Sequence, residues 1–198
     1  MSQFDPQAYG PLFAPLLAID RRRPLDAGQP NAAARPALEK ISVEAAFAHA
    51  ALEFGQAQPA DRDMAACCIA AVWLLHDYLD ESHHISQEID TPSGSFWHGI
   101  MHRREGDFSN AKYWFRRVGR HPVLDRLGQR AAERAATHGD ERAGQRLVTG
   151  GAWDPFAFVD LCESAVRGQS RDSDLCRDIQ QDEWEQLFDQ CYKAAVAK

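Results

Sequence analysis

The sequence has no apolar run long enough to cross a membrane. A transmembrane helix needs about 20 consecutive apolar residues, whereas the apolar patch at 12–19, LFAPLLAI, is short and is interrupted by Pro15. The first residues, MSQFDPQAYG, also lack the basic start of an export signal. We therefore expect a cytoplasmic protein that has no membrane partner.

Cysteines are few, and none of them has the CxxC spacing of a zinc knuckle or a redox motif. An odd number of cysteines without paired spacing argues against a disulfide framework, so we expect reduced thiols in the core. The chain has five of them: Cys67, Cys68, Cys162, Cys176 and Cys191.

Positive charge is also in short supply. The chain has 22 Lys and Arg against 29 Asp and Glu, which gives a net charge of -7 and argues against nucleic acid as the main partner. The basic residues nevertheless gather in one short stretch. A small basic island in an acidic protein suits a small anion better than a long polyanion. The island comprises Arg103, Arg104, Lys112, Arg116, Arg117 and Arg120, against only Glu105 and Asp107.

The common catalytic signatures are missing as well. There is no G-x-S-x-G elbow, no Walker loop and no G-x-G-x-x-G after a strand. Cys67 and Cys68 lie in an apolar helical segment, where a catalytic thiol is not expected. The sequence therefore predicts no named reaction, and only the place and the kind of chemistry can be inferred.

Helical periodicity runs through most of the chain and predicts an all-α fold, with no convincing period-2 strand. With 198 residues, the chain can close the core of one domain. We expect a single domain over 1–198, an array of about seven or eight helices, in which 20–38 forms an irregular proline-rich connector. The expected helices cover 6–19, 42–57, 60–89, two shorter helices within 94–119, 122–137, 155–167 and 173–195, and 138–151 is expected to be a loop.

Histidines near the end of the 60–89 segment have the spacing of a metal site borne by a helix. In one continuous helix His76, Asp80 and His83 would share a border of the apolar stripe, at i, i+4 and i+7. His76 and Asp80 can equally form an ordinary hydrogen-bonded pair on a helix surface.

The stretch WHGIMHRRE, at 97–105, has a second pair of histidines. His98, His102 and Glu105 lie on one helical face, and His-x3-His is a spacing at which two imidazoles reach one ion. Gly99 stands where the glutamate of the protease motif HExxH would be, which excludes that mechanism. If this pair meets His76 or His83, a mononuclear zinc-like centre results. The alternative is a buried network of His, Glu and Arg, and acid–base catalysis by His98 or His102 also stays open.

The adjacent arginines are candidates for binding an anion. One of Arg103 and Arg104 is expected to face inward, where a carboxylate such as Glu105 or Asp107 must pair with it. Guanidinium groups also bind carboxylate or phosphate with two hydrogen bonds. The expected ligand-binding residues are therefore Arg103, Arg104, Glu105, Tyr113 and Arg117.

Two resemblances accompany these patterns. REGDFSNAKYWFRRVGRHP resembles the second half of one tetratricopeptide repeat, which implies a helical hairpin packed through Phe108, Ala111, Phe115 and Val118. The string from Ser82 to Gly119 resembles an uncharacterised family of microbial helical proteins that keeps Ser-His, Ile-Ser-Gln, Thr-Pro, Trp-His, Met-His-Arg-Arg-Glu and Lys-Tyr-Trp with paired arginines. This second resemblance implies that the two groups of histidines belong to one unit.

Two functions of different classes follow. The first is a helical protein that binds a small polar or anionic molecule, a divalent metal or both in a pocket lined by His and Arg, with the metal held by His76, His83, His98 and His102. The sequence leaves open whether this protein is an enzyme. The second is a tetratricopeptide-like interaction module, which would present Tyr113, Trp114 and the basic face to an acidic protein partner.

Overall fold

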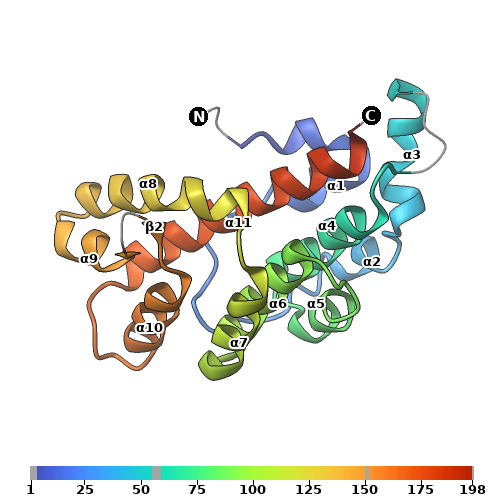
Figure 1. The fold of residues 1–198 in the computed structure, drawn as a ribbon. Helices are drawn as coiled ribbons and strands as arrows, with labels where there is room; N and C mark the ends of the chain where they lie inside the picture. The colour runs from blue at the N-terminus through green and yellow to red at the C-terminus, as the bar shows by residue number, and fades with distance from the viewer. Residues whose placement is uncertain (1–3, 55–58, 150–151, 198) are drawn as a thin grey trace.

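The computed structural model describes residues 4–54, 59–149 and 152–197, and it confirms the all-α fold (Figure 1). The described residues form eleven α-helices, one 3-10 turn and one small hairpin of strands. These elements are η1 Pro6–Tyr9, α1 Gly10–Leu17, α2 Arg35–Leu38, α3 Val43–Phe54, α4 Arg62–Leu75, α5 Leu79–Ser86, α6 Pro92–Glu105, α7 Phe108–Val118, α8 Pro122–Thr137, α9 Glu141–Arg146, β1 Val148–Thr149, β2 Ala152–Trp153, α10 Pro155–Val166 and α11 Ser173–Val196.

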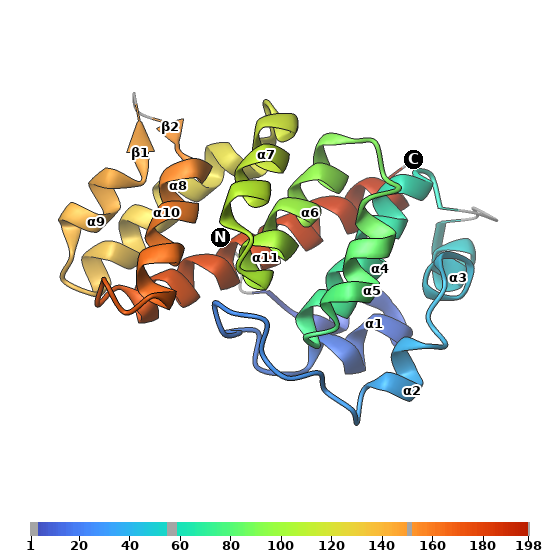
Figure 2. The same ribbon diagram turned by 90° about the horizontal axis from the view of Figure 1, so that it is seen from below.

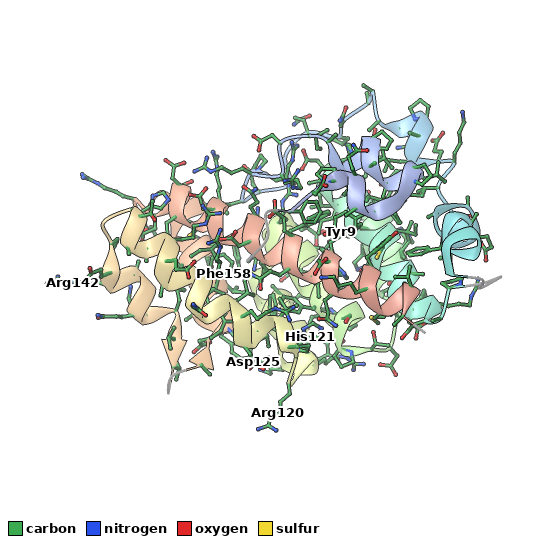
Figure 3. All side chains as sticks on the ribbon, turned by 90° about the horizontal axis from the view of Figure 1, so that it is seen from above. Tyr9, Arg120, His121, Asp125, Arg142 and Phe158 are labelled. Carbon is green, nitrogen blue, oxygen red and sulfur yellow. The ribbon has the colours of Figure 1, made fainter. Side chains whose placement is uncertain are left out.

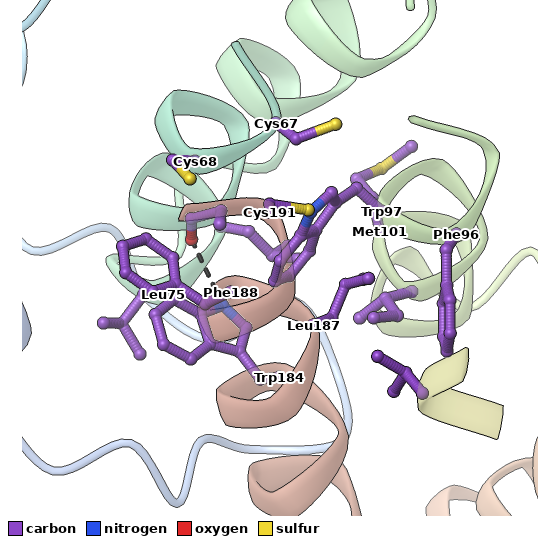
Figure 4. Close-up of a cluster of buried hydrophobic side chains, with 14 of the residues drawn as sticks. Cys67, Cys68, Leu75, Phe96, Trp97, Met101, Trp184, Leu187, Phe188 and Cys191 are labelled. Atoms are coloured by element: carbon purple, nitrogen blue, oxygen red, sulfur yellow. Dashed lines mark hydrogen bonds between the residues drawn. The ribbon is translucent and has the colours of Figure 1, made fainter. Parts of the chain in front are cut away.

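Helix α11 runs along the length of the molecule and organises the other helices (Figures 1 and 2). It packs against α4 in one half of the array, and against α8 and α10 in the other half. The apolar core where α4, α6 and α11 meet contains Trp97, Trp184 and the buried free thiol of Cys191 (Figure 4). All five cysteines are buried and free, as the sequence predicts.

Capping side chains fix where several helices begin. The carboxylates of Asp61 and Asp107 and the hydroxyl of Thr91 accept hydrogen bonds from the backbone N–H groups at the starts of α4, α7 and α6, respectively. Pro92 and Pro155 stand at first helical positions, where the missing N–H costs nothing. The local sequence therefore sets these starts.

The predicted helix over 60–89 is wrong, because the chain turns at residues 76–78. Helix α4 ends at Leu75 and α5 begins at Leu79. Between them, Asp77 adopts a φ of 64°, a left-handed conformation that a short polar side chain tolerates better than most. The expected count of seven or eight helices was too low partly for this reason.

Two further details differ from the prediction. The expected loop at 138–151 contains the short helix α9, and β1 pairs with β2 in an antiparallel register of Val148 with Trp153. Strands of two residues are too short to show alternation in a sequence. The connector at 20–38 is irregular as expected, except for the single turn of α2 at its end.

Among the described residues, no helix combines the length and apolar character that a membrane crossing requires. The surface carries extended charged side chains instead. Figure 3 shows Arg120 reaching away from the body of the molecule, whereas its neighbour His121 lies inward at the start of α8, where it is buried.

Candidate metal centre

Three histidines from two neighbouring helices meet at one point. Helices α5, α6 and α7 pack side by side (Figures 1 and 2), and the short link between α5 and α6 brings His83 to His98 and His102. One ligand nitrogen from each imidazole lies within 4.8 Å of the other two. The ring centroids are 4.6 Å apart for His83 and His98, 5.2 Å for His83 and His102, and 4.7 Å for His98 and His102.

The link between α5 and α6 is close enough to depend on a glycine. A Cβ on Gly94 would lie 2.2 Å from the carbonyl oxygen of Ile89. On the other side of α6, a Cβ on Gly99 would lie 3.1 Å from the ring of Phe115 in α7. Both glycines therefore let neighbouring backbone or side chains approach α6 more closely than a larger residue would allow.

Ser86 decides which nitrogen of His98 is free. The Ser86 hydroxyl donates to the carbonyl oxygen of His83 at 3.3 Å and lies 3.2 Å from Nδ1 of His98. Because the hydroxyl proton is already used, Ser86 accepts a hydrogen bond from Nδ1–H of His98. Nε2 of His98 is then the nitrogen whose lone pair is left for an ion.

Glu105 and Asn110 make the same selection at His102. Nδ1 of His102 lies 3.0 Å from Oε2 of Glu105, and Nε2 lies 3.0 Å from the amide nitrogen of Asn110. A carboxylate accepts and an amide nitrogen donates, so His102 carries its proton on Nδ1 and its lone pair on Nε2. A ligand histidine that donates its second N–H to a carboxylate is the usual arrangement in metal sites.

Aromatic stacking closes one side of the cluster. The indole of Trp114 packs on the ring of His98, with centroids 4.0 Å apart and planes tilted by 32°. The guanidinium of Arg117 lies 5.1 Å above the Trp114 ring and forms an ion pair with Asp90 at 2.9 Å. His98 is thus held between Ser86 and an apolar wall.

Burial keeps two of the imidazoles uncharged at neutral pH. Desolvation, followed by the nearby His102 and His83, lowers the pKa of His98 to about 3. Desolvation and the proximity of His102 also lower the pKa of His83. Unprotonated imidazole is the form that binds metal, so these two side chains are ready to ligate without first losing a proton.

His76, predicted as a further metal ligand, lies outside this cluster. Its Nδ1 lies 3.0 Å from the amide nitrogen of Asn31, and its Nε2 lies 3.0 Å from the carbonyl oxygen of Leu16. The turn at Asp77 is the reason, because it breaks the helix that was expected to align His76 with His83. His76 instead joins the N-terminal segments to the end of α4.

Arg103 and Arg104 are both buried and face carboxylates, but not those that the sequence suggested. Arg103 pairs with Glu183 of α11, and neither side chain is exposed to solvent. Arg104 pairs with Asp77 at 2.6 Å and also donates to the carbonyl oxygens of Asp26, Ala27 and Leu74. These partners come from distant parts of the chain, which local spacing could not reveal. With their charges paired in this way, neither arginine is available to clamp an external anion.

The remaining predicted ligand residues lie near the surface. Glu105 is half exposed and holds His102, Arg117 is tied to Asp90, and Tyr113 is exposed. The sequence did not single out Ser86, Asn110 or Trp114 as parts of the site. Ser86 lies on the face of α5 that faces α6, and Asn110 follows its cap Asp107 by three residues, but neither pattern by itself indicates a role at an imidazole.

A histidine–serine pair outside the cluster, His121 with Ser93, lacks the geometry for nucleophilic catalysis. Nε2 of His121 lies 3.1 Å from the hydroxyl of Ser93, and Nδ1 of His121 accepts from the backbone N–H of Val123 at 3.2 Å. The proton of the neutral ring is therefore on Nε2, which donates to Ser93 and cannot take a proton from it. This pair caps α8 and joins it to α6.

Comparison of the chain with the known protein families, with curated proteins and with solved structures found no match in any of the three. The function is therefore argued from the geometry of the histidine cluster. The resemblances noted in the sequence remain predictions.

Proposed function

We propose that this chain binds a divalent, zinc-like metal ion through His83, His98 and His102. The convergence of three ligand nitrogens within 4.8 Å of one another carries the proposal. Zinc bound to imidazole has Zn–N distances of about 2.0–2.1 Å, so small rotations of the three side chains suffice to close around an ion. An all-imidazole donor set suits zinc, copper, nickel or iron, and it disfavours magnesium and calcium, which prefer oxygen.

Three protein ligands leave one position of a tetrahedral ion open. Zinc sites that are closed and structural have four protein ligands, whereas three protein ligands and a water are typical of sites that act on a substrate. When bound, such an ion polarises its ligand and lowers the pKa of a coordinated water. We therefore propose that a small polar or anionic molecule binds at the open position.

This arrangement changes the role proposed for His98 and His102. Each ring has one nitrogen bonded to Ser86 or Glu105, and the other nitrogen directed by that bond to serve an ion. Both therefore act as metal ligands, and neither keeps a free nitrogen for acid–base catalysis.

The alternative, an interaction module, has less support. Its support is that Phe108, Ala111, Phe115 and Val118 are buried in the hairpin of α6 and α7. However, much of the basic stretch expected to meet an acidic partner is engaged within the chain, although Arg120 reaches away from the body of the molecule (Figure 3). Lys112 pairs with Asp160, Arg116 lies over Phe156 and Arg117 pairs with Asp90. We also propose a cytoplasmic location, which the free buried thiols support.

Metal analysis of the purified protein tests the proposal. The chain should bind one equivalent of Zn²⁺, and His98→Ala and His102→Ala should each abolish stoichiometric binding. His84→Ala is the matched control, because His84 is exposed and bonds to the backbone of its own helix, and this variant should bind like the parent. Failure of the parent chain to retain or take up metal would refute the proposed function.

A further inference from the structure

The amide of Asn110 occupies the position where an ion would approach His102. Its nitrogen lies 3.0 Å from Nε2 and 3.5 Å from Nδ1 of that ring. Because Nδ1–H is committed to Glu105, the lone pair on Nε2 accepts a hydrogen bond from Asn110. This amide N–H therefore occupies the lone pair that a metal would take.

We infer that Asn110 donates a hydrogen bond to an oxygen anion bound at the open position of the metal, and thereby selects hydroxide or a small carboxylate as the ligand. This inference rests on the proposed metal site. An ion at Nε2 takes over the lone pair and leaves the amide N–H without its acceptor. The positive end of the N–H dipole cannot point at a cation, so it turns to the nearest negative atom, which is the atom coordinated to the metal.

The backbone keeps Asn110 close to the ion while its amide changes from one hydrogen-bond acceptor to the other. The carboxylate of Asp107 accepts a hydrogen bond from the backbone N–H of Asn110 at 3.1 Å and so anchors the first turn of α7. Only the side-chain torsions of Asn110 are free to change. The amide therefore moves by a short swing between two acceptors, the imidazole of His102 and the metal-bound atom.

Exposure shows from which side a ligand can enter. His98 and His102 are buried, whereas His83, Asn110 and Trp114 are half-buried. The open position thus faces solvent between α5 and the first two turns of α7, where the indole of Trp114 forms an apolar wall. That surrounding favours a ligand with a compact anionic head.

The arginines nearby cannot donate this hydrogen bond to an anion on the metal. Arg103 and Arg104 are fixed to Glu183 and Asp77 inside the protein, as described above. Arg117 is fixed to Asp90 at the surface. Asn110 is an uncharged donor already in contact with a ligand imidazole, so it can respond to the metal without carrying a charge that repels it.

The experiment uses the full chain loaded with Co²⁺, whose visible absorption reports ligand number and exchange. Acetate and formate are titrated separately into the parent and into Asn110→Ala, with Ser109→Ala as the matched control from the same turn. Loss of a hydrogen bond to a charged acceptor should weaken the binding of both anions roughly tenfold in Asn110→Ala. Affinity for Co²⁺ should be unchanged or slightly higher, because the donor that competes for His102 is gone.

The outcomes separate this inference from the proposed function. Absence of Co²⁺ binding in the parent chain defeats both. Normal Co²⁺ binding with equal anion affinities in the parent and in Asn110→Ala overturns the inference and leaves the metal site standing. Loss of Co²⁺ binding in Asn110→Ala alone shows that Asn110 is a metal ligand, which also overturns the inference. Asn110→Leu, which keeps the side-chain shape, provides the same comparison if the alanine variant does not fold.

Discussion

At the scale of single residues, hydrogen bonds outside the cluster prepare the imidazoles for an ion. Neither Ser86 nor Glu105 is a proposed metal ligand, yet each fixes the proton on the far nitrogen of an imidazole proposed to bind the ion. Outer partners of this kind are typically responsible for a factor of about 10 to 100 in metal affinity.

Glu105→Ala should therefore weaken Zn²⁺ binding by about 10- to 100-fold while the fold stays intact. The cause is loss of the carboxylate that accepts Nδ1–H of His102. Competition with a coloured chelator measures the Kd. Glu88→Ala, at an exposed position just beyond α5, is the control. An unchanged Kd in Glu105→Ala would show that this hydrogen bond does not orient the ring.

His121 should make the stability of the chain depend on pH. Burial, followed by the nearby Arg126, lowers its pKa to about 4, whereas an unfolded histidine titrates near 6.5. The unfolded chain therefore takes up the proton first, so the stability is complete above about pH 6.5 and falls as the pH drops toward 4. A difference of this size corresponds to roughly 3 kcal/mol of unfolding free energy.

Urea denaturation from pH 7.5 to 4 measures this loss, and His121→Asn isolates it. Asparagine can still cap α8 but does not titrate. The variant should therefore show a shallower loss of unfolding free energy in this range. Parallel curves for the parent and the variant would mean that His121 stays neutral in both states or titrates equally in both.

Part of the candidate site could be predicted from the sequence. The i, i+4 spacing of His98 and His102, with Glu105 three residues later, predicted one face of one helix, and that face exists. The structure brings His83 to this face and leaves His76 away from it, because the turn at Asp77 changes the direction of the chain between them. The contact of the Asn110 amide with His102 could not be predicted, because it depends on how α7 folds back over α6.

At the scale of elements, the site depends on how closely α5 and α6 approach. Gly94→Ala should cost on the order of 2 kcal/mol, because the new Cβ would lie 2.2 Å from a backbone oxygen and must push the α5–α6 link apart. Helix propensity alone predicts the opposite sign, a gain of up to about 1 kcal/mol. The same displacement should move His83 away from His98 and weaken metal binding.

Gly128→Ala is the control for this prediction. It lies within α8, and its new Cβ would meet Trp153 no closer than 3.5 Å, an ordinary contact. Its unfolding free energy should stay level or rise. Chemical denaturation and a Zn²⁺ titration of both variants make the comparison, and a stable Gly94→Ala chain with normal metal affinity would contradict the importance of the link.

At the scale of the whole molecule, the buried hydrophobic residues form one continuous cluster from Tyr9 to Ala195. If this core unfolds as one unit, metal bound between α5 and α6 should stabilise helices that never touch it. At a free Zn²⁺ concentration 100 times the Kd, the expected gain is about 2.7 kcal/mol.

Hydrogen exchange measured by mass spectrometry tests this expectation. Amides of α8 and α10 that exchange only through global unfolding should slow about 100-fold on metal binding, as should those of α5 and α6. The His98→Ala variant should show no change on addition of Zn²⁺. Protection confined to α5, α6 and α7 would reveal two separate units and contradict the single-domain prediction.

The fold as a whole was more predictable than its connections. Helical periodicity and caps placed α8, α10 and α11 within a few residues, but they joined α4 to α5 and missed α9. The long-range ion pairs could not be predicted, because Arg103 had plausible partners two residues away in Glu105 and four away in Asp107, yet it pairs with a glutamate 80 positions later. Sequence spacing indicates only which carboxylates lie near an arginine along the chain. Which carboxylate pairs with it depends on the packing of the whole fold.

The fully buried pair of Arg103 and Glu183 also sets an order of events during synthesis. The proposed metal ligands lie within residues 83–102, so they leave the ribosome long before Glu183 does. Until α11 is made, the guanidinium of Arg103 lacks this counter-charge, and because burying an unpaired charge is costly we expect α6 not to reach its final position. We therefore expect a nascent chain stalled before Glu183 to leave the three histidines apart and to bind Zn²⁺ more weakly than the full chain.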